Sequence, residues 1–285
     1  MSQAVPSRVR LASIALTSVL FVILFAQPMM TLGRDWWNNP DAGHGLLLAP
    51  LALWLAWRKG IRPDARPNLA LGIALIAGAV LLRYVSSLAA EQFTSRASLL
   101  MALGGLVTLE FGFRQLLWWW LPSLLLILSI PLPDVVLSGL ALPLQFKASQ
   151  LGAELLSMRG VPVRLDGNVI QLPGHSLFVT EACSGLRSLT ALLSLGVLLG
   201  GLMLQSPVTR VLLVALSIPV AVVINGIRVF LTGFLVLFVD PAMGEGFTHL
   251  TEGWLMFVVA FAVLGALTWV MMRVERRVQG RGAHA

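Results

Sequence analysis

Long apolar runs separated by short charged stretches constrain this chain more than any other feature of its sequence. Several runs approach the ~20 residues that an α-helix needs to cross a bilayer. Of the 285 residues, 57% are hydrophobic and only 12% are charged, whereas an ordinary soluble domain has about twice that share of charge. The sequence therefore predicts an all-α polytopic membrane protein.

The apolar runs predict about eight transmembrane helices. Their expected limits, in chain order, are about 11–31, 46–57, 69–89, 97–113, 115–131, 186–204, 211–228 and 254–272. Residues 230–239 are apolar but too few to cross a bilayer alone. Two alternatives follow for the seventh span, which is either one long bent helix or a span followed by a re-entrant piece.

The positive charge is distributed as membrane topology requires. The net charge is +7, but the Lys and Arg residues lie between the apolar runs rather than in one patch, as the positive-inside bias would place them. The stretch from Arg58 to Arg66 is the clearest cytoplasmic marker. Arg8 and Arg10 before the first span, and the basic residues after the last, predict that both termini are cytoplasmic. Nucleic acid is not an expected partner; the lipid bilayer is.

One part of the chain departs from the transmembrane pattern. Residues 135–158 are too polar for lipid and predict an amphipathic or re-entrant helix on the outer surface. Residues 161–179 alternate around Asp166-Gly167-Asn168, which predicts a β-hairpin. The expected organisation is a five-span part (11–134), an outer helix and hairpin (135–182), a three-span part (183–272) and a cytoplasmic tail (273–285).

The only cysteine, Cys183, stands where the strand-like segment gives way to an apolar helix expected to begin near Ser184. The first turn of a helix favours thiolate, which is the reactive form of the side chain. Arg187 lies one turn away and adds positive charge, Gly185 leaves room for another group, and Glu181 precedes the turn. The alternative is a small buried apolar residue.

Alternation of the spans predicts that three polar features lie on the same outer side: Cys183, the pair Asn225 and Arg228, and His249. Asn225 and Arg228, spaced i and i+3, share a helix face, and the guanidinium fork of Arg228 suits an oxyanion. The alternative for this arginine is contact with lipid headgroups. His249, expected in a loop before the last span, could exchange protons with the thiol.

Two further histidines could act near this surface. His175 lies eight residues before the cysteine and competes with His249 as the base, and His44 could line the same outer surface. The histidines and the single cysteine lack the spacing of metal ligands, so neither a metal nor another cofactor is expected. A thiol, a guanidinium and an imidazole together indicate a site for acyl transfer through a thioester.

Three motifs resemble the exosortase family. They are Glu181-Ala-Cys-Ser-Gly-Leu-Arg-Ser-Leu, Pro219-x-Ala-x-x-x-Asn225-x-x-Arg228, and His249 before the last span. Gly167-Asn-Val-Ile-x-Leu-Pro and Asp41-x-x-His44-Gly-x-Leu-x-x-Pro50 are similar too, although Ala42-Gly43 replaces the expected Tyr-Ser.

The resemblance implies a cysteine peptidase or transpeptidase of the bacterial inner membrane, with Cys183, Arg228 and His249 as its catalytic set. Its substrates would be exported, membrane-anchored proteins whose C-terminal sorting signal has a short motif such as Pro-Glu-Pro, a transmembrane helix and a basic tail. Because the family is often encoded with exopolysaccharide biosynthesis, proteins of such a system are expected partners. The alternatives are a transporter or channel and a polysaccharide-modifying acyltransferase.

Overall fold

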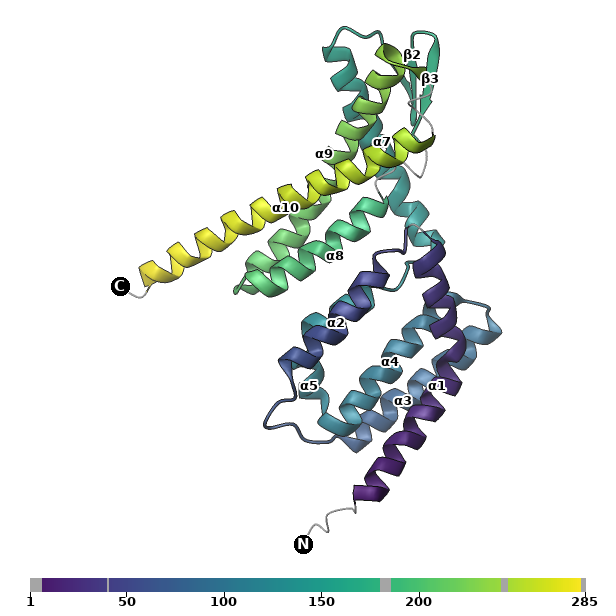
Figure 1. The fold of residues 1–285 in the computed structure, drawn as a ribbon, viewed down its shortest axis with the longest axis vertical. Coiled ribbons are helices and arrows are strands. Elements are labelled where there is room, and N and C mark those ends of the chain that lie inside the picture. The colour runs from purple at the N-terminus through teal and green to yellow at the C-terminus, as the bar shows by residue number, and fades with distance from the viewer. Residues whose placement is uncertain (1–6, 40, 180–185, 242–245, 283–285) are drawn as a thin grey trace. The chain divides into compact units, whose positions relative to one another are not determined.

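The computed structural model describes residues 7–39, 41–179, 186–241 and 246–282 of the chain. It is mostly helical and divides into two compact units, Met1–Pro131 and Leu132–Ala285. The first unit (Figure 1) contains six helices in its described residues: α1 Ser7–Asn38, α2 Gly45–Lys59, α3 Leu69–Leu88, α4 Gln92–Phe111, α5 Phe113–Trp118 and α6 Trp120–Leu128.

Helices α3 and α4 form a tight hairpin in the first unit. The Glu91 carboxylate caps α4, accepting hydrogen bonds from the backbone N–H of Phe93 at 2.9 Å and of Thr94 at 2.6 Å. Gly72 of α3 lies so close to α4 that a methyl group there would be 2.7 Å from the Cα of Leu109. Small residues at such positions let membrane helices approach each other closely.

A partly buried ion pair ties α1 to this hairpin. Arg96, which is only 3% exposed, donates to the Asp35 carboxylate at 2.7 Å and to Gln92 at 2.8 Å. Asp35 and the two tryptophans after it lie in the last turns of α1, which continues to Asn38. The first helix is therefore longer than the predicted span of about 11–31.

Helix α2 packs antiparallel to α5 and α6. At one end the buried Gln115 accepts from the backbone N–H of Arg62 at 3.0 Å and donates to the Gly60 carbonyl at 3.2 Å. At the other end the Trp36 indole N–H donates to the Ser129 carbonyl at 2.7 Å. The expected single fifth span is two short helices, which meet at Trp119.

The second unit contains four helices and a small sheet in its described residues. Their bounds are α7 Asp134–Met158, β1 Arg164–Asp166, β2 Val169–Leu172, β3 His175–Phe178, α8 Leu186–Met203, α9 Pro207–Phe238 and α10 Gly246–Gly282. Helices α8 and α10 pack on the N-terminal half of α9, and α7 packs along its C-terminal half.

The predicted turn at Asp166-Gly167-Asn168 joins two paired strands of a small sheet. Its three strands are antiparallel in the order β1-β2-β3, and the turn at Gly167 has the positive φ of 62° that glycine adopts at little cost. Ile170 and Leu172 point into a core shared with α7 and α9. The third strand ends one residue before Val179.

Four helices among the described residues are long and apolar enough to cross a membrane: Thr17–Asn38 in α1, α3, α9, and Leu255–Val278 in α10. The described helices that coincide with the other expected spans are shorter or more polar, so the structure supports a multi-pass membrane protein without establishing eight spans. Helix α9 decides between the two alternatives for residues 230–239, because they continue the same helix.

Candidate active site

Helix α9 carries the two site residues that the structure describes most fully. Asn225 is 4% exposed and Arg228 is half-buried, and they lie about one turn apart on the same face. The Thr232 hydroxyl donates to the Arg228 carbonyl at 3.0 Å, one turn further along. A buried amide beside a half-buried guanidinium gives this face of the helix several hydrogen-bond donors.

Two apolar cores meet along α9 at the level of these residues. Ile224 belongs to the core that α9 forms with α8 and α10. Val229 belongs to the core that α9 forms with α7 and the sheet. Asn225 and Arg228 therefore lie where the helical core ends and the sheet-bearing core begins, and both cores fix the helix around them.

The second core depends on a close approach of α7 and α9. Gly152 of α7 lies against Val229, and Leu156, one turn further along α7, lies against Gly233. Because the contacts advance in the same direction along both chains, the two helices run parallel. A helix that sequence analysis placed on the outer surface thus packs along the helix that carries Arg228.

Gly226 is the contact nearest the site. A methyl group on this glycine would lie 2.3 Å from Cδ2 and 2.8 Å from Cβ of Leu151. The absence of a side chain at Gly226 therefore lets α7 reach α9 between Asn225 and Arg228.

Helix α8 runs antiparallel to α9. Gly200 of α8 lies against Arg210 of α9, and Gly196 lies against Val214. From the first contact to the second, the chain moves one turn back along α8 and one turn forward along α9. The same register, continued toward the start of α8, brings Leu186 about level with Ile224 to Ile227.

Helix α10 is also held antiparallel to α9. The buried Glu275 carboxylate accepts from the backbone N–H of Gln205 and of Ser206, both at 3.0 Å, and from the Thr209 hydroxyl. This contact fixes the C-terminal part of α10 at the start of α9, so the N-terminal part of α10 extends in the direction of Arg228.

The predicted nucleophile and its neighbours lie outside the described residues. They are Glu181, Cys183, Ser184 and Gly185. Arg187 is in α8 and His249 is in the first turn of α10, and in both cases only the backbone is described. The prediction of a loop around His249 was therefore wrong, because α10 begins at Gly246.

The two other candidate histidines occupy different environments. His175 is exposed at the start of β3, with Nδ1 3.4 Å from the Pro173 carbonyl. His44, in the first unit, precedes α2, and its Nε2 lies 3.2 Å from the Leu128 carbonyl. Burial lowers the pKa of His44, although hydrogen bonds to the backbone of Leu128 and Asp41 and the Asp41 charge act in the opposite direction.

Sequence reasoning missed one contact beside the site. The side chain of Asn168, in the turn between β1 and β2, donates through Nδ2 to the Val179 carbonyl at 3.1 Å. The Val179 N–H donates in turn to the Asn168 carbonyl at 3.0 Å. Asn168 stands in one of the motifs quoted above, but a motif does not show that its side chain reaches eleven residues along the chain.

Comparison with protein families gives one match that covers most of the chain. The sequence model of the family described as transmembrane exosortase matches residues 36–266. The chain belongs to the transmembrane exosortase family. The matched region covers most of each unit and includes the positions of Cys183, Arg228 and His249.

Comparisons with the curated proteins and with the solved structures found no significant match. Membership of the exosortase family, together with the long apolar helices, makes the protein a multi-pass membrane enzyme of the kind that processes sorting signals.

Proposed function

We propose that this exosortase is a thiol peptidase or transpeptidase that cleaves the C-terminal sorting signal of exported membrane-anchored proteins. The observation that carries the proposal is the antiparallel register of α8 and α9. Leu186, the first described residue of α8, is level with Asn225 by this register and follows Cys183 by three residues. The only thiol of the chain is thus joined directly to the helix end nearest Arg228.

The length of α9 supports a site at a membrane surface. Its 32 residues extend for ~48 Å at ~1.5 Å per residue, whereas the hydrocarbon core is about 30 Å thick. If α9 enters the bilayer near Pro207, about 20 residues bring it to the opposite surface near Arg228. The sheet and the C-terminal half of α7 then lie beyond the hydrocarbon, where an extended polar segment of a substrate is accessible.

The chemistry follows from the three side chains in their proposed roles. The Cys183 thiolate attacks the carbonyl carbon of the scissile peptide bond, and Arg228 donates hydrogen bonds to the oxyanion that forms. The carbon–nitrogen bond then breaks as His249 gives a proton to the leaving amine. Water or an amine then attacks the carbonyl carbon of the resulting thioester and gives a proton to His249. The carbon–sulfur bond breaks, which releases the acyl product and restores the Cys183 thiolate.

The same proposal gives the protein its setting. The enzyme would lie in the bacterial inner membrane with both termini in the cytoplasm and the site at the periplasmic face. Its partners would be the tailed substrates and the proteins of an exopolysaccharide system. Reporter fusions at the C-terminus and in the β1–β2 turn test this orientation, because they should report opposite sides of the membrane.

The function is tested by co-expression with a tagged protein that carries a motif, a transmembrane helix and a basic tail. Wild type should shorten the tagged protein on a mass-resolved gel. Arg228→Ala and His249→Ala should abolish shortening, while His175→Ala should leave it intact. If His175→Ala lost shortening and His249→Ala kept full activity, His175 on β3 would be the base instead.

A further inference from the structure

The segment that leads to Cys183 is held at its start by one carboxamide. Asn168 fixes both backbone polar groups of Val179, the N–H through its own carbonyl at 3.0 Å and the carbonyl through Nδ2 at 3.1 Å. Val179 is 1% exposed and packs in the core formed by α7, α9 and the sheet. It is the last described residue before 180–185.

The backbone of the turn does not by itself require asparagine at position 168. Asparagine often occupies turns because it tolerates positive φ. Here the residue with positive φ is Gly167, at 62°, and Asn168 is not among the described residues with positive φ. The side chain of Asn168 instead makes the long-range contact with Val179.

The same carboxamide reaches the helix that braces Arg228. Nδ2 of Asn168 also lies 3.4 Å from Oε1 of Gln145, a 4% exposed residue of α7. Helix α7 in turn packs against α9 at Gly226. A continuous set of contacts therefore runs from the segment before Cys183, through Asn168 and α7, to the part of α9 that carries Arg228.

We propose that Asn168 is a positioning residue for the thiol site, holding the start of the cysteine segment at a fixed place relative to Arg228. This inference rests on the proposed function, since it assigns Asn168 a role in the rate of a reaction at Cys183. A side chain that positions a nucleophile affects turnover more than substrate binding. Misplacement by about 1 Å can cost ~100-fold in rate.

The test compares Asn168→Ala with Gln171→Ala, an exposed position on β2 of the same sheet. The full-length enzyme in lipid discs is given the tailed substrate, and the rate is divided by the amount of folded enzyme. We expect kcat of Asn168→Ala to fall ~10- to 100-fold with KM within about twofold, as for misplacement of a reacting group. Gln171→Ala should behave as wild type.

A second readout uses the single cysteine directly. The rate at which a maleimide modifies Cys183 should change at least threefold in Asn168→Ala and remain at the wild-type value in Gln171→Ala. A lower melting temperature with unchanged kcat per folded enzyme and unchanged modification would overturn the inference, because Asn168 would then only stabilise the fold. Cleavage by Cys183→Ser, measured beside these variants, would instead reject the proposed function.

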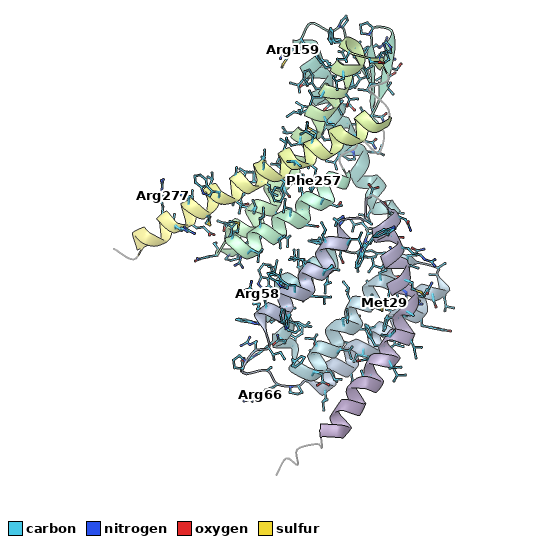
Figure 2. The ribbon with its side chains drawn as sticks, viewed as in Figure 1. Met29, Arg58, Arg66, Arg159, Phe257 and Arg277 are labelled. Carbon is cyan, nitrogen blue, oxygen red and sulfur yellow. The ribbon has the colours of Figure 1, made fainter. Side chains whose placement is uncertain are left out.

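A separate observation concerns the connection between α2 and α3 in the first unit. Lys59 Nζ lies 4.6 Å, and the Arg62 guanidinium carbon 5.7 Å, from the centre of the Trp118 ring. One carboxylate, Asp64, pairs with Arg62 at 2.8 Å. Figure 2 labels Arg58 near the end of α2 and Arg66 in this connection.

Buried hydrogen bonds hold the backbone of this basic surface in place. Gln115, fully buried, holds the connection through Arg62 N–H and the Gly60 carbonyl, and the Trp119 indole donates to the same carbonyl at 3.0 Å. Two cations and one carboxylate, Asp64, leave a formal charge of +1 beside the exposed indole ring, which favours an anionic ligand. A marker of membrane topology alone needs the charge but not this fixed geometry.

We infer that Lys59, Arg62 and Trp118 form a binding site for the phosphate of an anionic phospholipid. The ring suits the membrane interface and the cations suit the headgroup. The melting temperature should rise when phosphatidylglycerol replaces phosphatidylcholine in the lipid discs. We expect Lys59→Gln with Arg62→Gln to lose at least half of that rise, while Arg277→Gln, at the end of α10 (Figure 2), keeps it.

Two results would overturn the lipid site. One is an equal rise of the melting temperature in wild type, the double variant and Arg277→Gln, which would show that the rise depends only on the overall charge of the membrane. The other is the same rise on adding inorganic phosphate to discs of phosphatidylcholine, which would show a site for soluble anions. Neither result bears on Cys183, so the two inferences fail independently.

Discussion

At the scale of single residues, Arg228 matters because of the shape of its side chain as well as its charge. It is half-buried, one turn from a buried asparagine. A guanidinium presents a planar fork of donors, whereas a lysine ammonium is a compact point charge. The role proposed for Arg228 therefore requires the fork.

Arg228→Lys should accordingly retain the fold and lose most of the activity. Removal of one oxyanion donor typically costs ~100- to 1,000-fold in kcat, and we expect at least a tenfold loss for this conservative change. Cleavage of the tailed substrate under single-turnover conditions measures it. Arg164→Lys, on the exposed face of β1, is the control, and equal activity of both variants would contradict the role.

His44 gives a prediction about stability. Because burial lowers its pKa in the folded protein, the unfolded chain binds a proton more readily, starting near the ordinary value of about 6.5. The free energy of unfolding should therefore decrease as the pH falls through and below that value.

The measurement compares melting temperatures of wild type and His44→Gln at pH 7.5 and 5.5. The decrease on acidification should be smaller in the variant, since glutamine does not titrate in this range. A decrease that is equal in both proteins would mean that His44 contributes nothing to the pH dependence.

At the scale of elements, the contact between α7 and α9 depends on glycine. Gly226→Ala would put a methyl group 2.3 Å from Leu151, and such overpacking typically costs ~1–3 kcal/mol. Gly265→Ala, on α10, meets nothing within 4 Å, and there the helix should gain about 0.5–1 kcal/mol in stability.

The two glycine variants should therefore change the melting temperature in opposite directions. Gly226→Ala should also lower activity, because the backbone that the added methyl group displaces lies between Asn225 and Arg228. Stabilisation by both substitutions, with full activity, would show that the approach of the two helices is not required.

The carboxylate of Glu275 gives an independent test of the contact between α9 and α10. It caps the start of α9 through Gln205 and Ser206, and loss of a cap typically costs ~0.5–2 kcal/mol. Glu275→Ala should lower the free energy of unfolding by about that amount. Val278, which is 66% exposed on the same helix, is the control, and Val278→Ala should have little effect. An equal decrease of the free energy of unfolding in both variants would mean that the Glu275 carboxylate does not stabilise this contact.

The elements could largely be predicted from the sequence, but their pairing could not. Hydropathy located the helices, and Asp166-Gly167-Asn168 located the hairpin. The parallel packing of α7 on α9 depends on which glycines face each other, and the Glu275 cap joins residues about 70 positions apart. The polar residues of α7 predicted a surface position, whereas Ala148, Ala153 and Leu156 of this helix are buried in a core shared with α9.

The candidate site could be predicted as a set of residue types rather than as a geometry. The residues of the site motifs, including Asn225 and Arg228, were identified from their chemistry and their family resemblance. The contact of Asn168 with Val179 was not, because a hydrogen bond between a turn and a strand end leaves no periodic pattern in the sequence.

At the scale of the whole molecule, two compact units share one family match. The first unit ends at Pro131, and the match extends from residue 36 in that unit to residue 266 in α10. The second unit contains α8, α9 and α10, the sheet, and the positions of all three proposed catalytic residues. We therefore propose that the second unit performs the chemistry, and we predict that processing depends on its only thiol.

The most direct test of that claim is processing of the tailed substrate by wild type and by Cys183→Ser, followed on a mass-resolved gel. Wild type should release the shortened protein and, when quenched early, show a covalent adduct that hydroxylamine removes. Cys183→Ser should show neither the product nor the adduct. Continued release of the shortened protein by Cys183→Ser would contradict the account, because the chain has no other cysteine to replace it.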